Sequence, residues 1–450
     1  MKKGRTKFLL VIFEVFILGI LAGVTGLFIL HQLGFFPQKT ETKDEPSTGK
    51  IQWEPIEESG AGTQNGTGAD DLQDTNAAKE PDAAKDPEAA NDPDAANDPS
   101  AVNGADAGKE LDAAGESGKM QEPGVYYKEA ATPGEVTLLF AGDVLFDDSY
   151  SPMVSLKRRE NGVDDCFSME LLQEMRDADI FMLNNEFTFT DRGEPLPDKS
   201  FTFRSRPENV KYLFDMGADL VSLANNHSFD FGEISLLDTL DTLEQAGMPQ
   251  VGAGRNLEEA EAPVFFEVDG IRIGFLSATQ IERMKNPPTR GATQTEPGVF
   301  RCLDPAELYR KVEETKKLCD YLVVFIHWGT EKTDEIDWAQ KEQGPGLAAA
   351  GADLVIGAHP HVLQGLDSAD GVPIVNSLGN FWFNSFTLDT CVVKVTLDKN
   401  GLKSFQFLPA LQKDCRTVLT QGAEKKRVLD YMRSLSPHVQ IDEEGYVTFM

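Results

Sequence analysis

The chain has 450 residues, with 42 Lys and Arg against 74 Asp and Glu, and a formal net charge of −32 at pH 7. Residues 135–450 alone hold 30 basic and 51 acidic residues, a net charge of −21. This charge argues against non-specific binding to nucleic acid or anionic lipid, because both partners are polyanions. An anionic substrate would need a local cation to offset the field, and a bound metal ion is one such cation.

The first apolar feature along the chain is a run of 23 residues from Phe8 to Leu30, which is long enough to span a bilayer core of about 30 Å. Four basic residues precede this run, and no Lys or Arg follows it until Lys39. The asymmetry predicts a cytoplasmic N-terminus and an extracellular remainder. We therefore expect residues 1–37 to form a cytoplasmic tip and a single-pass transmembrane anchor in the cell membrane. A cleavable signal peptide is the alternative, although its apolar region is usually shorter, about 7–15 residues.

Residues 38–133 are rich in Asp, Glu, Ala, Pro, Gly and Asn, and they contain a six-residue repeat from Glu80 to Asn103. Its units read EPDAAK, DPEAAN, DPDAAN and DPSAVN. Proline in every unit, low hydrophobicity and negative charge predict a solvated, disordered linker. We expect a stalk that holds the following domain away from the membrane; a binding role for the repeat is the alternative.

Residues 134–450 have a globular pattern in which strand-like and helical segments alternate. Apolar runs predict strands at Glu135–Asp143, Ile180–Asn185, Leu220–Asn225, Tyr321–His327 and Leu354–His359. Amphipathic patterns predict helices at Ser168–Arg176, Glu208–Met216, Ile234–Ala246, Pro305–Cys319 and Trp338–Ala350. Turns at Asp269-Gly270 and Asn400-Gly401 predict two β-hairpins. Parallel strands with crossover helices, together with antiparallel hairpins, predict an α/β sandwich.

Polar residues of the kinds that bind metal ions lie at the carboxyl end of each of the five predicted strands or directly after it. They are Asp143; Asn184, Asn185 and Glu186; Asn225, Asn226 and His227; His327; and His359 with His361. Because ligands of open α/β sheets lie outside the carboxyl ends of the strands, we expect a metal site there. Taken singly, Asp143 is also typical of a turn, and His327 of a satisfied core histidine. Asp230, three residues after His227, is suited to orient its imidazole.

The segment GAHPHV gives the strongest single signal, because His359 and His361 flank one proline at a predicted strand end. Alternation along a strand would place both imidazoles on the same face. We therefore expect these two histidines to share one chelate with Asp143 and His327.

The motifs GD, N-x-E, ANNHxxDxG, HWGxE, GADLVIGxHPH and NSLGNF occur in this order between Glu135 and Phe383. This combination resembles the capsule A-type (CapA-like) family of poly-γ-glutamate biosynthesis proteins. The resemblance implies a calcineurin-like metallophosphoesterase sandwich, with two mixed sheets flanked by helices. It also implies a divalent metal cofactor, Mn, Zn or Fe, present as one ion or two.

The resemblance also assigns roles to individual residues. The implied metal ligands are Asp143, Glu186, Asn226, His327, His359 and His361. His227, oriented by Asp230, is implied as the general acid. The residues expected to bind substrate are Asn184, Asn225, Arg204, Glu331 and Asn380.

Three positions depart from the metallophosphoesterase pattern. Leu145 stands where that pattern has a histidine ligand, and Glu186 stands where a bridging aspartate is usual. Ala358 separates Gly357 from the first histidine, where the pattern pairs glycine directly with histidine. The number of metal ions, one or two, therefore stays open.

The resemblance implies an extracellular component of poly-γ-glutamate synthesis and export that works beside membrane-embedded polymer synthetase subunits. Its substrate would be an anionic polymer or a phosphorylated compound, and a metal site would support hydrolysis or acyl or phosphoryl transfer. Two other functions stay open. One is a non-catalytic polymer-binding or export scaffold with a vestigial site, and the other is a surface metallophosphoesterase unrelated to the capsule.

Overall fold

The computed structural model describes residues 122–281 and 289–449. The predicted membrane span at Phe8–Leu30 and the predicted linker as far as residue 121 lie outside the described residues. Among the described residues, no helix is long and apolar enough to cross a membrane.

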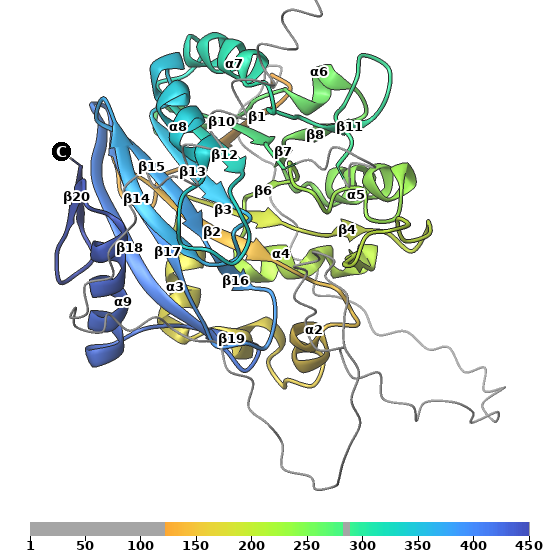
Figure 1. The fold of residues 1–450 in the computed structure, drawn as a ribbon, viewed down its shortest axis with the longest axis horizontal. Coiled ribbons are helices and arrows are strands. Elements are labelled where there is room, and N and C mark those ends of the chain that lie inside the picture. The colour runs from red at the N-terminus through yellow and green to blue at the C-terminus, as the bar shows by residue number, and fades with distance from the viewer. Residues whose placement is uncertain (1–121, 282–288, 450) are drawn as a thin grey trace, which may run out of the picture. The chain divides into compact units, whose positions relative to one another are not determined.

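Two large mixed sheets form the domain (Figure 1). The first sheet has seven strands in the order β1-β9-β10-β12-β13-β15-β14. These strands are β1 Val125–Lys128, β9 Val264–Val268, β10 Ile271–Thr279, β12 Tyr321–His327, β13 Leu354–Ala358, β14 Leu363–Ala369 and β15 Val372–Leu378. From β10 to β15 the neighbouring strands run parallel, while β9 and β14 are antiparallel to their neighbours β10 and β15.

The second sheet has eight strands in the order β19-β18-β17-β2-β3-β6-β7, with β16 paired to β2. These strands are β2 Val136–Val144, β3 Ile180–Asn185, β6 Leu220–Ser222, β7 Gln250–Val251, β16 Asn380–Trp382, β17 Leu388–Asp398, β18 Gly401–Lys413 and β19 Arg416–Leu419. Its parallel half, β2-β3-β6-β7, carries the first three polar motifs. Three short strand pairs complete the fold: β4 Thr188–Phe189 with β5 Arg204–Ser205, β8 Ala253–Gly254 with β11 Gly298–Val299, and β20 Val439–Ile441 with β21 Val447–Phe449.

Most helices lie on the outer faces of the two sheets, whereas the helix Gly422–Leu435 packs its buried residues into the cluster between the sheets. The helices are α2 Ser151–Leu156, α3 Met169–Asp177, α4 Lys211–Met216, α5 Glu233–Ala246, α6 Leu257–Ala260, α7 Ala306–Lys316, α8 Trp338–Ala350 and α9 Gly422–Leu435. One buried cluster joins α3, α4 and α5 to the second sheet, and another joins α7 and α8 to the first sheet. The prediction of two mixed sheets flanked by helices is confirmed at this level.

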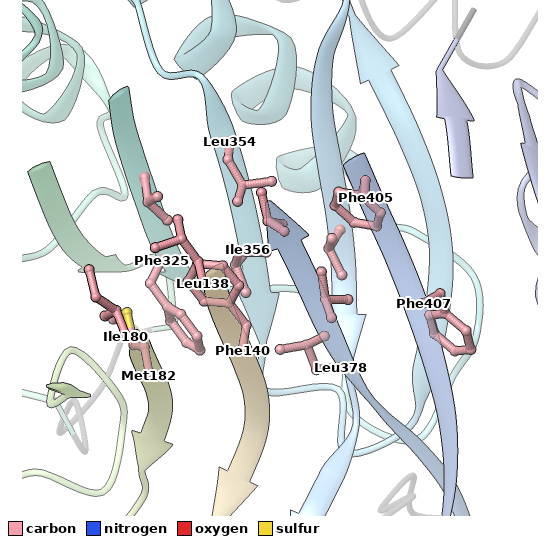
Figure 2. Close-up of a cluster of buried hydrophobic side chains, with 14 of the residues drawn as sticks. Leu138, Phe140, Ile180, Met182, Phe325, Leu354, Ile356, Leu378, Phe405 and Phe407 are labelled. Atoms are coloured by element: carbon pink, nitrogen blue, oxygen red, sulfur yellow. The ribbon is translucent and has the colours of Figure 1, made fainter. Parts of the chain in front are cut away.

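The core explains why the sheets stack. In β12, Tyr321, Val323 and Phe325 point into a cluster between the sheets, and the alternate residues point toward α7 and α8. All seven residues of β12 are buried, as expected for a parallel strand covered on both faces. Figure 2 shows Leu138 and Phe140 of β2 in the same inter-sheet cluster as Phe325.

Most predicted elements are present with small shifts at their ends. β3, β12 and α8 have the predicted bounds, and both hairpins form at the predicted turns. The helix predicted at Glu208–Met216 divides into a 3-10 turn, Pro207–Val210, followed by α4. The strand predicted at Leu220–Asn225 ends at Ser222, and the one predicted to reach His359 ends at Ala358.

Strand β1 lies inside the range predicted to be linker. Val125 to Lys128 pair in parallel with Phe265 to Val268 of β9, and the Lys128 ammonium forms a 2.6 Å ion pair with Asp219. The folded domain therefore begins before residue 134. The segment VYYK has only four residues, and both of its tyrosines are exposed. It therefore lacks the long apolar run by which the inner strands were predicted.

Candidate metal centre

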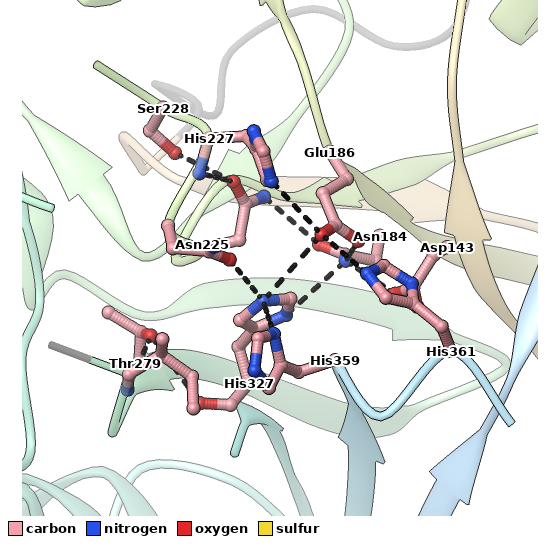
Figure 3. A network of polar contacts seen from close by, with 12 residues as sticks. Asp143, Asn184, Glu186, Asn225, His227, Ser228, Thr279, His327, His359 and His361 are labelled. Atoms are coloured by element: carbon pink, nitrogen blue, oxygen red, sulfur yellow. Dashed lines mark hydrogen bonds and ion pairs between the residues drawn. The ribbon is translucent and has the colours of Figure 1, made fainter. Parts of the chain in front are cut away.

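The carboxyl ends of strands from both sheets meet at one site, where the predicted ligands come together (Figure 3). Glu186, His327 and His359 form one group whose ligand atoms all lie within 4.8 Å of one another. Asp143, Glu186 and His361 form a second group that meets the same limit. Glu186 belongs to both groups, so it is the residue that connects them.

The Glu186 carboxylate is fully buried, and its two oxygen atoms differ. Oε2 accepts a 3.0 Å hydrogen bond from the Asn184 amide, whereas Oε1 has no hydrogen-bond partner within the described residues. Leaving such an atom unsatisfied costs about 1–3 kcal/mol. The Nε2 atoms of His361, His227 and His327 lie 3.7, 3.8 and 3.9 Å from this oxygen.

These separations fit a divalent cation. Two ligand atoms bonded at about 2.1 Å to one ion are about 3.0–3.4 Å apart at octahedral or tetrahedral angles. The distances from Glu186 Oε1 are slightly longer than this, so the space between the carboxylate and the imidazoles accommodates an ion after a small contraction. The chemistry of the donor set, carboxylate and imidazole, suits Mn, Zn or Fe.

Asp143 and His361 form a close pair within the second group. His361 Nδ1 lies 3.0 Å from Asp143 Oδ2 and 2.8 Å from Asn380 Oδ1, and both of these atoms are acceptors. We therefore place the ring proton on Nδ1, which leaves Nε2 as the ligand atom facing Glu186. Burial raises the pKa of Asp143, but His361 and the Asn184 amide outweigh burial and lower it overall. Burial lowers the pKa of His361, but Asp143 outweighs burial and raises it overall.

His327, His359 and Asn226 converge on the other side of Glu186. His327 Nε2 lies 2.8 Å from Asn226 Oδ1 and 3.0 Å from His359 Nδ1. Burial, followed by the neighbouring imidazoles, lowers the pKa of His327 well below its usual value, and burial lowers that of His359 to about 3. Both rings are therefore neutral at pH 7, which is the state that binds a metal ion.

That His359 and His361 share one chelate with Asp143 and His327 stays a prediction, and the closest groups of ligand atoms divide these four residues. His359 belongs to the group with His327, and His361 to the group with Asp143. The strand ends at Ala358, so strand alternation does not apply to these residues. The backbone φ angles of His359 and His361 are 101° and 60°, a left-handed conformation that costs non-glycine residues about 1–3 kcal/mol each. This turn directs the two rings to different groups.

His227 lies beside the two groups and belongs to neither. Its Nδ1 is 2.7 Å from Asp230 Oδ2, and its ring stacks on Phe203 with centroids 4.3 Å apart. Burial is the largest of the effects that lower its pKa to about 4. The imidazole is neutral at pH 7, and with Nδ1–H donated to Asp230 its Nε2 is a proton acceptor. The predicted general acid is therefore a base until it has taken up a proton.

Asn184 and Asn225 were expected to bind substrate, but both are fully buried and bonded to protein groups. Asn184 donates to Asp143 Oδ1 at 2.7 Å as well as to Glu186. Asn225 donates to Asn184 Oδ1 at 3.1 Å, and its own Oδ1 accepts from the His227 backbone N–H at 3.0 Å. These amides are placed to orient the ligands, and they have no exposed surface for substrate.

The other three residues predicted to bind substrate have different surroundings. Asn380 is buried, and it contacts His361 as described above. Glu331 is exposed, and its charge contributes to raising the pKa of Glu186. Arg204 is exposed, and its guanidinium lies over the Phe231 ring at 4.6 Å. Leu145, at the position of the missing histidine, is buried in the core on the helical side of the second sheet.

Lys199, Phe203 and Phe383 also surround the candidate site, and the sequence did not reveal them. Lys199 pairs with Asp230, and Phe203 stacks on His227. The Phe383 ring lies 4.9 Å from the His361 ring and 5.5 Å from the Phe203 ring. Their positions in the sequence could have indicated them. Lys199 and Phe203 are close in sequence to Arg204, a predicted substrate-binding residue, and Phe383 follows the NSLGNF motif.

Comparison with known proteins finds similar proteins over the part of the chain that carries these residues. The family model described as bacterial capsule synthesis protein PGA_cap matches residues 137–385. PGA biosynthesis protein CapA of Bacillus subtilis (strain 168) is 30% identical over 275 residues, covering 60% of this chain and 70% of that protein. Capsule biosynthesis protein CapA of Bacillus anthracis is 31% identical over 241 residues, covering 51% of this chain and 57% of that protein.

Among solved structures, a 5'-nucleotidase from Candida albicans aligns with a TM-score of 0.34 at 11% identity. That alignment covers 60% of this chain and 53% of the nucleotidase, and a likeness this low does not establish a shared fold. The family match, in contrast, covers more than half of the chain and spans every predicted metal ligand. The chain therefore belongs to the bacterial capsule synthesis protein family PGA_cap.

Proposed function

We propose that this chain is an extracellular, membrane-anchored component of poly-γ-glutamate capsule synthesis or export with a metal-dependent hydrolase-type site. The observation that carries the proposal is the Glu186 carboxylate, which is shared by two ligand groups and keeps one oxygen atom without a hydrogen bond among the described residues. The names of the two Bacillus relatives supply the polymer and the capsule. The carboxylates and imidazoles of the candidate site support the hydrolase class.

The candidate ligands and the amides beside them would have different roles. Asp143, Glu186, Asn226, His327, His359 and His361 would hold one or two divalent cations. When bound, such a cation supplies Lewis-acid polarisation of the attacked carbonyl or phosphoryl oxygen. Asn184 holds Asp143 and Glu186 in place, and Asn380 holds the His361 ring. This set of carboxylates, imidazoles and one amide would suit a site of the metallophosphoesterase type, in which Glu186 would belong to both ligand groups.

His227 would move the proton. Its neutral Nε2 accepts a proton from the attacking water as the new bond to the substrate forms. The imidazolium then gives this proton to the leaving group as the old bond breaks. Asp230 fixes the ring through Nδ1 and stabilises the transient positive charge. No net proton is gained or lost by the protein over the cycle.

The predicted anchor and stalk would set the location of the domain. An N-terminal span at Phe8–Leu30 would hold the chain in the membrane beside the polymer synthetase subunits. The acidic linker would place the domain outside, where it meets the anionic polymer. Since residues 135–450 carry a net charge of −21, a polyanion would approach most favourably at the cations in the site.

The experiment measures polymer in cells that lack this chain and express the wild type or His227→Asn. The hydrolase proposal expects His227→Asn to be produced and to hold its metal while polymer output falls. Wild-type output from this variant, with output lost when the chain is absent, would favour a scaffold with a vestigial site. Unchanged output in the absence of the chain would instead favour a surface metallophosphoesterase unrelated to the capsule.

A further inference from the structure

A single loop holds the segment that carries Asn226, His227 and Asp230. We call residues 191–203, between β4 and β5, the clamp loop. The Leu196 N–H donates to the Asp230 carbonyl at 2.8 Å, and the Phe203 N–H donates to Asp230 Oδ2 at 2.6 Å. The clamp loop therefore holds both the backbone carbonyl and the side-chain carboxylate of Asp230.

The clamp loop also approaches this segment very closely at Gly193. The φ angle of Gly193 is 82°, and a Cβ atom at this position would lie 2.1 Å from the Phe231 carbonyl oxygen. Only glycine permits this approach, because any other side chain would overlap the backbone. The contact fixes the distance between the clamp loop and the segment after Asp230.

Lys199 is the cation of the clamp loop that points inward. Most residues from Asp191 to Ser200 are exposed, but the Lys199 side chain is only 8% exposed. Asp198, immediately before it, has a φ angle of 62°, a conformation that is uncommon for residues other than glycine. The backbone therefore adopts a strained turn at the point where the lysine enters the interior.

The contacts of Lys199 connect the two halves of the candidate site. Its Nζ donates to the Asn226 carbonyl oxygen at 2.6 Å and forms an ion pair with Asp230 Oδ1. The other Asp230 oxygen, Oδ2, is 2.7 Å from His227 Nδ1. One ammonium group thus holds the backbone of a candidate metal ligand and the carboxylate that orients the candidate proton carrier.

The ion pair has a physical cost that a purely structural contact would avoid. Asp230 is fully buried and Lys199 is nearly so, and taking two such charges out of water costs several kcal/mol per ion before their attraction is counted. A pair of apolar residues would fill the same space at lower cost. The pair therefore fits a role in which Lys199 fixes the Asp230 carboxylate against His227 Nδ1 and so holds the tautomer of the His227 ring.

We propose that Lys199 is a positioning residue that aligns His227 and Asn226 together through Asp230 and the Asn226 carbonyl. This inference rests on the proposed function for its effect on turnover. Its effect on the geometry of His227 does not depend on that function.

The test uses the full chain in detergent with Mn²⁺ and the phosphodiester bis(p-nitrophenyl) phosphate as probes. Lys199→Met should lower kcat by about 10- to 100-fold, the usual effect of losing a partner behind a ligand, while KM and the melting temperature stay near wild type. Lys311→Met is the matched control, because Lys311 on α7 forms a largely buried 2.7 Å ion pair with Glu261, the residue that caps the C-terminus of α6. It should leave kcat unchanged.

Chemical rescue of the Lys199→Ala variant distinguishes a positioning role of Lys199 from a purely structural one. Lys199→Ala leaves a space for a small cation, so added ethylammonium should restore part of its kcat and should not affect Lys311→Ala. Wild-type kcat in Lys199→Met would overturn the proposal. A loss of kcat in Lys199→Ala that ethylammonium leaves unchanged would overturn it as well, because the lysine would then serve folding alone.

A second measurement keeps this inference separate from the proposed function. If the wild type neither binds Mn²⁺ nor hydrolyses the phosphodiester, the hydrolase proposal fails. The kinetics then do not test the role of Lys199, because there is no turnover to compare. The ¹⁵N chemical shifts of the His227 ring still report its tautomer in that case. Lys199→Met should convert a single Nδ1–H tautomer into a mixture of tautomers. An unchanged tautomer in Lys199→Met would overturn the positioning role.

Discussion

Glu186 Oε1 lies 3.7 Å from His361 Nε2 in the buried interior, and no donor among the described residues bonds to this oxygen. The two residues come from different sheets, Glu186 after β3 and His361 after β13. A carboxylate oxygen facing an imidazole lone pair is unfavourable once both groups have lost their protons, because both atoms are then acceptors. A divalent cation between the two atoms would bind both of them and so remove the unfavourable contact between two acceptors.

His359→Ala and His361→Ala should weaken metal binding separately, because the two histidines belong to different ligand groups. Each variant should lose part of the metal that the wild type holds, and the variant that lacks both should lose more than either. Loss of one ligand partner typically reduces metal affinity by a large factor. Elemental analysis of the purified chains measures this directly.

The matched control is His438→Ala, since His438 lies near the C-terminal strands and in neither ligand group. It should retain the wild-type metal content. If His359→Ala and His361→Ala each abolish all metal, the two histidines share a single ion and the division into two groups is wrong.

His227→Asn should keep the metal and the fold while it lowers turnover by about 10²- to 10⁴-fold, because it removes the proton carrier. Asp230→Asn should lower turnover less, since the ring remains but its tautomer and orientation are no longer fixed. Steady-state kinetics with bis(p-nitrophenyl) phosphate compares the two variants. A larger loss in Asp230→Asn at an unchanged melting temperature would contradict the assignment of His227 as the proton carrier.

Stabilisation by metal should increase with pH. Burial, and then the charge of Asp143, raise the pKa of Glu186 well above its usual value. Without metal, the folded chain holds this proton more tightly than the unfolded chain does. The resulting stability is therefore present at low pH, and it is lost as the pH rises through the folded-state pKa. A divalent cation replaces the proton, so binding strengthens as the proton leaves.

Thermal unfolding with and without Mn²⁺ tests this dependence. The Mn²⁺-induced rise in melting temperature should be larger at about pH 8 than at about pH 5, because the raised pKa values of Glu186 and His361 strengthen the competition from protons as the pH falls. Glu186→Gln should abolish the pH dependence of this rise together with most of its size. An equal rise at both pH values in the wild type would mean that no proton competes with the metal at these groups.

The predicted topology has its own test. Protease added to intact cells should cut within residues 38–121 and release the domain, because the Lys and Arg asymmetry predicts that this segment lies outside. In lysed cells the same fragment should appear. Complete protection in intact cells, with cleavage after lysis, would reverse the predicted orientation.

Burial on both faces explains which parts of the fold could be predicted. Ile180–Asn185 and Tyr321–His327 are buried along their whole length, so each appears in the sequence as an unbroken apolar run with a sharp polar end. The edge strand Val125–Lys128 has exposed positions and only four residues. Its pairing with β9 depends on contacts far along the chain, which a local pattern does not contain.

The site was predictable as a set of residues, and its internal arrangement was not. Every predicted ligand lies at, or a few residues after, the carboxyl end of a strand that reaches the site, which is a consequence of parallel topology. The division between His359 and His361 depends on left-handed backbone angles at two non-glycine residues, and residue preferences argue against such angles. Lys199 sits in a polar loop of ordinary composition, so only the fold reveals that it reaches Asp230.

The metal content of Glu186→Gln, measured by elemental analysis beside the wild type and Glu331→Gln, tests the shared carboxylate most directly. Glutamine keeps the shape of the side chain and removes its charge, and Glu331 is an exposed acidic residue outside both ligand groups. We predict that the wild type and Glu331→Gln contain the same divalent metal, and that Glu186→Gln loses most of it while remaining folded. Wild-type metal content in folded Glu186→Gln would contradict a metal centre built around Glu186.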